Sequence, residues 1–254
     1  MRIDKYLADM GVGTRSQIRK VIKAGRVTID GVTVNDPGCK VTADSHVEFD
    51  GSPVEYEEFI YYMLNKPAGV ISASEDPRED TVVDLIDEVR RRDLFPAGRL
   101  DRDTEGLLLI TNDGALAHRL LSPKHHVDKT YFARVLEDVT EEDALSFREG
   151  LILPDGLECM PAELEITRRC KASDIIDEDT GVSLADDPDA PVTEVLITIR
   201  EGKFHQIKRM FHAIGCEVIY LKRLSFGTLL LDPELAAGEY RRLSDSEISA
   251  LRNL

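Results

Sequence analysis

Residues 98–114 read GRLDRDTEGLLLITNDG, a polar loop that leads directly into an apolar run. Three acids at alternate positions, Asp101, Asp103 and Glu105, precede a glycine, and the apolar run after it predicts a buried strand. The loop opens like a calcium-binding loop, but its twelfth position, which should supply a bidentate carboxylate, is Asn112. Calcium is therefore disfavoured. A pair of catalytic carboxylates, as in a glycoside hydrolase, remains open because the sequence does not give their separation in space.

The composition limits the classes of partner. The chain has 254 residues, with 32 Lys and Arg against 48 Asp and Glu, a formal net charge of -16. Phosphates repel such a protein, which excludes one that binds nucleic acid over its whole surface but not one with a single basic face. No signal peptide or membrane-spanning apolar stretch is evident, and the four cysteines form no C-x-x-C pair. We expect a cytoplasmic protein without membrane contact or a zinc site.

The first fifty residues predict a small unit of two helices and a hairpin. Apolar residues recur at helical spacing in the first ten positions, and a second helix opened by Thr14 or Ser16 should stop at Gly25. Asp30-Gly31 stands between two short alternating runs, which is typical of a tight turn between strands.

This unit is basic in an otherwise acidic protein. Residues 1–26 carry seven basic side chains against two acidic ones, a balance of +5. A basic helix pair is typical of phosphate recognition, although a solvated helix face is an equally good interpretation from charge alone. The basic residues are Arg2, Lys5, Arg15, Arg19, Lys20, Lys23 and Arg26, and the acids are Asp4 and Asp9.

The rest of the chain predicts an α+β body. The polar segment 50–58 reads as a linker before an apolar strand at 60–64, which sets a domain boundary near residue 58. Residues 174–189 are rich in acids and read as an exposed excursion. Three helix starts follow from a Ser or Thr with an acid three positions later, and the first helix should run on to Val89. The pairs are Thr81 with Asp84, Thr140 with Asp143, and Ser244 with Glu247.

Three further segments combine basic residues with aromatic ones. Residues 201–215, EGKFHQIKRMFHAIG, predict an amphipathic helix with basic residues beside its apolar stripe. Residues 121–135, LSPKHHVDKTYFARV, surround Tyr131 with bases, which suits phosphate contact and base stacking, although a core tyrosine is the plainer alternative. Residues 62–74, YMLNKPAGVISAS, predict two strands around a loop. Taken singly, none identifies a reaction. The predicted stripe is Phe204, Ile207, Phe211 and Ile214.

In this order, LNKPAG, GRLDRDTEGLLLITNDG, SPKHHVDKTY and EGKFHQIKRMF resemble the motifs of bacterial ribosomal RNA pseudouridine synthases of the RsuA type. Residues 2–35 are similar to the small RNA-binding domain named after ribosomal small-subunit protein four. The resemblance covers nearly the whole chain and implies an α+β fold. Residues 1–58 would form a helix-helix-hairpin RNA-binding domain, and residues 59–254 a catalytic domain with a mixed, mainly antiparallel sheet and flanking helices. The acidic segment 170–191 is longer than in the family.

The family isomerises uridine in folded RNA to pseudouridine and needs no metal, redox change or nucleotide cofactor. The resemblance makes Asp101 the essential aspartate, Tyr131 the ring that stacks on uracil, and Lys208 the cation beside the aspartate. Many relatives have Arg in place of this lysine, with its bidentate fork. Arg99 resembles the arginine that fills the gap left by the extruded base. The expected RNA-binding residues are Arg99, Lys66, Lys124, His125, Lys129, His205, Gln206, Arg209, Arg2, Lys5, Arg15, Arg19, Lys20 and Arg26.

We therefore expect a monomeric enzyme that acts on ribosomal RNA or an assembling ribosomal subunit. The SPKHH sequence and the absence of a long basic C-terminal tail favour small-subunit (16S) RNA, with large-subunit (23S) RNA as the alternative. A non-catalytic ribosome-assembly factor is a second alternative, which the intact set of Asp101, Tyr131 and Lys208 disfavours. The net charge then predicts a polarised surface, with the acids away from the site.

Overall fold

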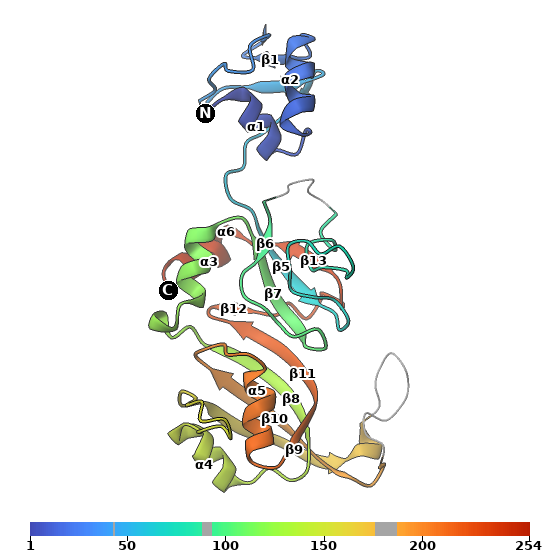
Figure 1. The fold of residues 1–254 in the computed structure, drawn as a ribbon, viewed down its shortest axis with the longest axis vertical. Helices are drawn as coiled ribbons and strands as arrows, with labels where there is room; N and C mark the ends of the chain where they lie inside the picture. The colour runs from blue at the N-terminus through green and yellow to red at the C-terminus, as the bar shows by residue number, and fades with distance from the viewer. Residues whose placement is uncertain (43, 88–92, 176–186) are drawn as a thin grey trace. The chain divides into compact units, whose positions relative to one another are not determined.

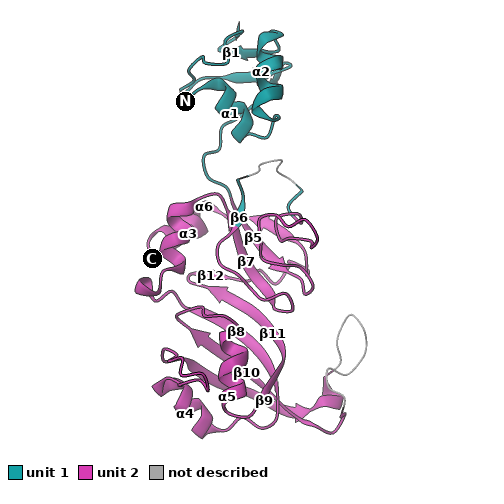
Figure 2. Cartoon of the chain, in the orientation of Figure 1, with its two compact units in different colours: residues 1–60, 86–95 teal, residues 61–85, 96–254 magenta. Residues whose placement is uncertain are grey.

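The structure is a computed structural model, and it describes residues 1–42, 44–87, 93–175 and 187–254 (Figure 1). The chain forms two compact units, residues 1–60 with 86–95 and residues 61–85 with 96–254, which Figure 2 colours separately. No helix within the described ranges is long and apolar enough to cross a membrane.

The first unit packs two helices on a small sheet. Its core buries apolar residues that recur at helical spacing. Ile3, Leu7, Ile18 and Ile22 are fully or almost fully buried there. The sheet has the strand order β2-β1-β3-β4. Its elements are α1 (Ile3–Asp9), α2 (Arg15–Lys23), β1 (Val27–Ile29), β2 (Val32–Thr33), β3 (Val47–Phe49) and β4 (Ser52–Pro53).

The turn and cap residues of this unit act as their sequence predicts. Thr14, rather than Ser16, caps α2: its hydroxyl accepts from the Gln17 N–H at 3.3 Å, and the Gln17 side chain accepts from the Thr14 N–H at 2.9 Å. Asp30 and Gly31 have φ values of +52° and +78°, which confirms the hairpin between β1 and β2.

The second unit is built on one sheet with the strand path β13-β5-β7-β11-β8-β10-β9, and β12 lies beside β11. The β7–β11 ladder is parallel, and the others along this path are antiparallel, which confirms the mixed, mainly antiparallel sheet. The parallel ladder has two residue pairs, Lys222 with Glu105 and Arg223 with Gly106, and it joins the two antiparallel halves. The strands are β5 (Tyr61–Lys66), β6 (Phe95–Pro96), β7 (Glu105–Thr111), β8 (Lys129–Leu136), β9 (Glu163–Lys171), β10 (Pro191–Ile199), β11 (Glu217–Phe226), β12 (Leu229–Leu230) and β13 (Tyr240–Arg242).

Helices flank this sheet. Helix α4 packs on β9, and helix α5 packs on β11. Between the two helices, the ring centroids of Phe147 and Phe211 lie 5.1 Å apart. The predicted caps Thr140 and Ser244 open α4 and α6 with complete capping boxes, and α4 ends before Gly150, whose φ is +95°. The helices are α3 (Gly114–Leu121), α4 (Glu141–Glu149), α5 (Gln206–Ala213) and α6 (Asp245–Arg252), with the short 3-10 turns η1 (Pro123–His125) and η2 (Ala172–Asp174).

The helix predicted to open at Thr81 does not form over the described residues 82–87. Thr81 and Asp84 do make the expected capping hydrogen bonds, with Asp84 Oδ2 accepting from the Thr81 N–H at 2.9 Å and from its hydroxyl at 2.7 Å. A turn follows instead, because Thr81 pairs with Ile71 in a β-bridge and the next residue donates its N–H to the Ile71 carbonyl. Tertiary pairing thus replaces the local helix signal. Val89 lies outside the described residues.

The acid-rich excursion is only partly described, since residues 176–186 lie outside the described ranges. Its two ends are joined: the Lys171 Nζ donates to the Asp189 carboxylate at 2.7 Å, where β9 and β10 pair.

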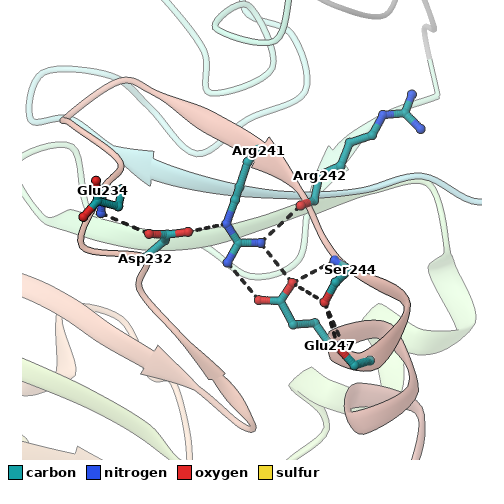
Figure 3. A network of polar contacts seen from close by, with 7 residues as sticks. Asp232, Glu234, Arg241, Arg242, Ser244 and Glu247 are labelled. Carbon is teal, nitrogen blue, oxygen red and sulfur yellow. Dashed lines mark hydrogen bonds and ion pairs between the residues drawn. The ribbon is translucent and has the colours of Figure 1, made fainter.

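Arg241 on β13 connects the last strand to the last helix (Figure 3). Its Nε donates to Asp232 at 2.5 Å, while Nη1 and Nη2 donate to the two Glu247 oxygens at 2.9 Å. Glu247 also accepts from the Ser244 N–H at 2.8 Å and so closes the capping box of α6. The hydrogen bonds from Arg241 lower the pKa of Glu247 to about 2, against the opposing effect of burial. This network joins β13, which pairs with β5, to Asp232 and to α6.

Candidate active site

The loop before β7 is held by the loop after β5. The Ser72 hydroxyl donates to the Leu100 carbonyl at 2.9 Å and accepts from the Leu100 N–H at 3.0 Å. The Gly69 N–H donates to the Arg102 carbonyl at 2.8 Å, and Arg102 Nε donates to the Gly69 carbonyl at 3.0 Å. Asp101 lies between these two anchors in the chain. Its backbone position is therefore set on both sides by contacts with residues far away in sequence.

Lys66 is a third anchor of this loop. Its side chain is fully buried, and its Nζ donates to the carbonyls of Pro67, Arg102 and Thr104 at 2.9, 3.1 and 2.9 Å. Burial lowers the pKa of Lys66 to about 8, although the charges of nearby acids oppose this shift. The expected RNA contact is wrong for Lys66, because its ammonium is enclosed and holds the backbone of the Asp101 loop.

Two basic side chains flank the Asp101 carboxylate. Lys208 Nζ lies 3.8 Å from Asp101 Oδ2, and His205 Nε2 lies 3.5 Å from Oδ1. The Lys208 ammonium donates its hydrogen bonds to Asp103 instead, at 2.6 Å to each oxygen. Burial would raise the pKa of Asp103, but the hydrogen bonds and charge of Lys208 outweigh it, and the pKa is lowered. One lysine thus serves two carboxylates.

The shared lysine argues against the two-carboxylate interpretation. In a glycoside hydrolase the paired acids face each other across the sugar. Here the Lys208 ammonium lies next to both Asp101 and Asp103 and occupies the position between them, where the sugar would have to lie.

Among the described residues, no group of three His, Cys, Asp or Glu side chains is arranged to hold a metal ion.

Asp101 and Tyr131 line the same cleft, which has a volume of about 830 Å³. Tyr131 lies on β8 opposite Arg223 of β11 and is 7% exposed. A smaller hollow of about 70 Å³ adjoins it and is lined by Asp101, Tyr131 and Lys208. The larger cleft is more basic than acidic, in contrast with the whole chain. Its basic residues are Arg99, Arg102, Lys129, Lys203 and Arg223, and its acids are Asp101 and Glu201.

Residues 60–213 match the family model described as RNA pseudouridylate synthase, and residues 1–47 match that of the S4 domain. The chain belongs to the RNA pseudouridylate synthase family. As a member of this family, it is an isomerase acting on RNA.

Full-length relatives of the synthase agree with this assignment. It is 47% identical to an uncharacterized RNA pseudouridine synthase of Bacillus subtilis, over 99% of this chain and 98% of the relative. It is 40% identical to ribosomal small subunit pseudouridine synthase A of Vibrio cholerae, over 99% of both chains. The Escherichia coli protein of the same name is 36% identical over 99% of this chain and 100% of its own. A crystal structure of pseudouridylate synthase superposes with a TM-score of 0.62 at 36% identity and covers 99% of both chains.

The predicted RNA-binding residues of the synthase's second unit separate into exposed and buried ones. Arg99 and His205 are exposed and line the cleft, and Lys124 and His125 are exposed on η1. Arg209 forms an ion pair with Asp155 at 2.5 Å.

Lys129 and Gln206 are buried, and their side chains bind protein groups. Lys129 is 6% exposed, and its Nζ donates to the Val127 carbonyl at 2.9 Å; burial, and then the charge of Arg223, lower its pKa to about 8. Gln206 is 3% exposed and donates to Glu201 at 2.6 Å. The chemistry of both side chains suits RNA contact. However, Lys129 on its strand and Gln206 on its helix point into the protein, so both are enclosed.

All six predicted residues of the synthase's first unit are exposed. Arg2 and Arg19 share Asp4, and Arg26 pairs with Asp50. Lys5, Arg15 and Lys20 have no ion-pair partner within the described residues, so their charges are available to a phosphate backbone.

Arg223 and Phe204 line the cleft but are not among the site residues expected from the sequence. Arg223 is 2% exposed, and its Nε donates to the Leu107 carbonyl at 2.6 Å. A basic residue at an inward position of a strand, between Leu221 and Phe226, was the available signal. Phe204 was placed on the apolar stripe of the helix at 201–215, which is wrong: α5 begins at Gln206, and His205 before it has a φ of +48°. This left-handed residue breaks the helical periodicity, and Phe204 is 74% exposed.

Proposed function

We propose that the synthase isomerises a specific uridine of small-subunit (16S) ribosomal RNA, free or in an assembling subunit, and acts in the cytoplasm as a monomer. The relatives named for the small ribosomal subunit support this target, since they align with the chain over nearly its whole length. A monomer is sufficient for this proposal, because Asp101, Tyr131 and Lys208 of one chain line a single hollow. In this proposal residues 1–58 bind RNA, and residues 59–254 carry the catalytic site.

One observation carries the proposal: Asp101, Tyr131 and Lys208 line a single hollow that opens beside a basic cleft. In the reaction the N1–C1′ bond of uridine breaks, the uracil turns, and C5 bonds to C1′; C5 loses its proton and N1 gains one. Asp101 acts on the ribose, as a nucleophile or as a base, and its charge balances the positive charge that develops on the sugar. Tyr131 stacks on the uracil at the cleft wall.

The target uridine has to leave its stack before this chemistry, at a cost of a few kcal/mol. Arg99 is exposed at the cleft and is the proposed group that fills the vacated position in the RNA. The exposed basic residues of the cleft, Arg99 and Arg102, and those of the first unit provide phosphate contacts that offset the cost.

Tritium release from RNA labelled at uracil C5 tests the assignment of Asp101. Asp101→Asn should abolish release, because the amide neither attacks the ribose nor removes its proton. Asp103→Asn is the matched control; it removes an exposed ion-pair partner of Lys208 and should keep appreciable activity. Equal losses in both variants would contradict the proposed roles. A single-turnover assay of the wild type separates an enzyme from a non-catalytic assembly factor, which would release no tritium.

The target RNA is tested by mapping pseudouridines with carbodiimide-induced reverse-transcription stops. Ribosomal RNA from cells with and without the gene is compared. We expect one stop in small-subunit RNA to disappear with the gene. Loss of a stop in large-subunit RNA alone would refute the proposed target.

A further inference from the structure

Phe204 is an exposed aromatic side chain at the catalytic cleft. It is 74% exposed, the highest value among the exposed large hydrophobic side chains of the described residues, and the only aromatic one in that group. Its ring stacks on the His205 ring with centroids 3.8 Å apart and planes 18° apart. Both residues line the cleft that holds Asp101.

The segment that carries Phe204 is held by buried contacts to which its ring does not contribute. The Lys203 N–H donates to Gln206 Oε1 at 3.0 Å, and Gln206 Nε2 donates to the buried carboxylate of Glu201 at 2.6 Å. Glu201 also accepts from the Met160 N–H at 2.8 Å. The backbone around Phe204 is therefore fixed from both sides while its ring remains in contact with solvent. This arrangement preorganises an apolar face without using it in the core.

Exposure alone would not assign a role, since single apolar side chains are common on protein surfaces. The charge of the cleft around Phe204 indicates what the ring binds. The cleft that it lines is more basic than acidic, and its exposed basic residues Arg99 and Arg102 favour a negatively charged occupant. An anionic polymer that also offers flat apolar groups is a nucleic acid, and unpaired RNA bases stack on exposed aromatic rings.

We propose that Phe204 is a stacking site for an unpaired nucleobase next to the target uridine in the bound RNA. The proposal rests on the proposed function in one respect, that RNA occupies the cleft. His205 supports one side of the Phe204 ring and also lies 3.5 Å from Asp101, so a base stacked here is close to the reacting nucleotide. Because every base has an aromatic face, the site contributes affinity and register more than a choice among the four bases.

The test uses the full-length protein and a synthetic RNA hairpin that contains the mapped target uridine. Phe204→Ala should raise the Kd by about 5- to 150-fold, the range that corresponds to the loss of one stacked base. Phe204→Tyr should bind within about two-fold of the wild type, because it keeps the ring. Leu230→Ala is the control for removal of an exposed apolar side chain, since Leu230 is 72% exposed and does not line the cleft.

A second arm separates stacking from a merely structural role. The bases on either side of the target uridine are replaced one at a time by abasic nucleotides. At one position the penalty of Phe204→Ala should vanish, because the RNA no longer has a base to stack there. A penalty that stays the same on every abasic RNA would overturn the proposal, as would a Kd for Phe204→Ala within two-fold of the wild type.

The same samples distinguish failure of this proposal from failure of the proposed function. A wild type that binds RNA and releases tritium, together with a Phe204→Ala variant of unaltered Kd, refutes only the stacking site. A wild type that binds without releasing tritium refutes the proposed reaction, and the binding arm still decides the role of Phe204. A wild type that does not bind the RNA overturns both.

Discussion

Gly106 lies where β7 and β11 run parallel, and its replacement by alanine should damage both stability and activity. Its φ is +97°, and a Cβ at this position would lie 2.2 Å from the Arg223 carbonyl oxygen and 2.7 Å from the Arg223 nitrogen. Both contacts are with backbone, so no side-chain rotation relieves them. The two strands would have to separate by roughly 1 Å to reach ordinary contact distances.

The expected loss has two parts. A positive φ costs a non-glycine residue about 1–3 kcal/mol, and overpacking costs about 1–3 kcal/mol more. We therefore expect Gly106→Ala to lower the free energy of unfolding by about 2–6 kcal/mol, a large share of the 5–15 kcal/mol typical of folded proteins. Gly69→Ala is the matched control, because Gly69 has a φ of +88° and open space around its missing Cβ. Gly69→Ala should lower the free energy of unfolding only by the cost of the positive φ, about 1–3 kcal/mol.

Urea unfolding followed by far-ultraviolet circular dichroism measures these losses, since the protein has no tryptophan. Hydrogen exchange of peptides from β7 and β11 should localise the change, because two compact units need not unfold together. Activity of the folded fraction should fall by about 100-fold, since Asp101 precedes β7 whereas Tyr131 lies on the strand paired with β11. A loss for Gly106→Ala no larger than that for Gly69→Ala would refute the reasoning.

Three further variants test other parts of the structure. Glu247 has a pKa of about 2 when folded, against 4.5 ordinarily, so the stability it contributes is present above pH 4.5 and is lost as the pH falls towards 2. Glu247→Gln should therefore lower the free energy of unfolding by about 2–3 kcal/mol at pH 7, and this loss should be smaller at pH 3. A loss that is the same at both pH values contradicts the ion pair with Arg241. Replacing Arg15 and Lys20 together by Ala should reduce the salt dependence of RNA affinity by about one unit of log–log slope per lost phosphate contact, and an unchanged slope argues against the basic helix as the anchor. Lys208→Met should lower kcat at least tenfold yet change the free energy of unfolding by less than about 1 kcal/mol, because its ion pair is exposed; wild-type kcat would remove it from the catalytic set.

Local signals in the sequence predicted the local structure well. The capping pairs at Thr140 and Ser244 start helices, and the Asp30-Gly31 turn closes a hairpin, because these preferences depend on hydrogen bonds and φ angles within a few residues. The same kind of signal failed at Thr81, where the capping hydrogen bonds form but a bridge to Ile71 prevents a helix.

Side-chain roles were harder to predict than elements. Lys66, Lys129 and Gln206 have the chemistry of RNA contacts but are buried and bonded to the protein. Arg223 reaches the cleft from a strand that carried no recognised motif. The spacing of apolar residues predicts Phe204 on the stripe of a helix, because the left-handed residue after it leaves no signal in that spacing. Residue type indicates what a side chain can bind, whereas burial decides what it does bind.

The amino-acid sequence alone determined the family resemblance, the basic first unit and the identity of Asp101, Tyr131 and Lys208 as a set, because these depend on the order of motifs along the chain. The tertiary structure decided which groups meet. Asp101 and Tyr131 are 30 residues apart in sequence. Asp101 lies in the loop before β7 and Tyr131 on β8, and both strands pair with β11. Lys208 is shared between Asp101 and Asp103. The basic cleft within a chain of net charge -16 likewise exists only after folding. The physical reason is that electrostatic and stacking interactions depend on separations of a few ångströms in space, and the fold sets these separations independently of distance along the chain.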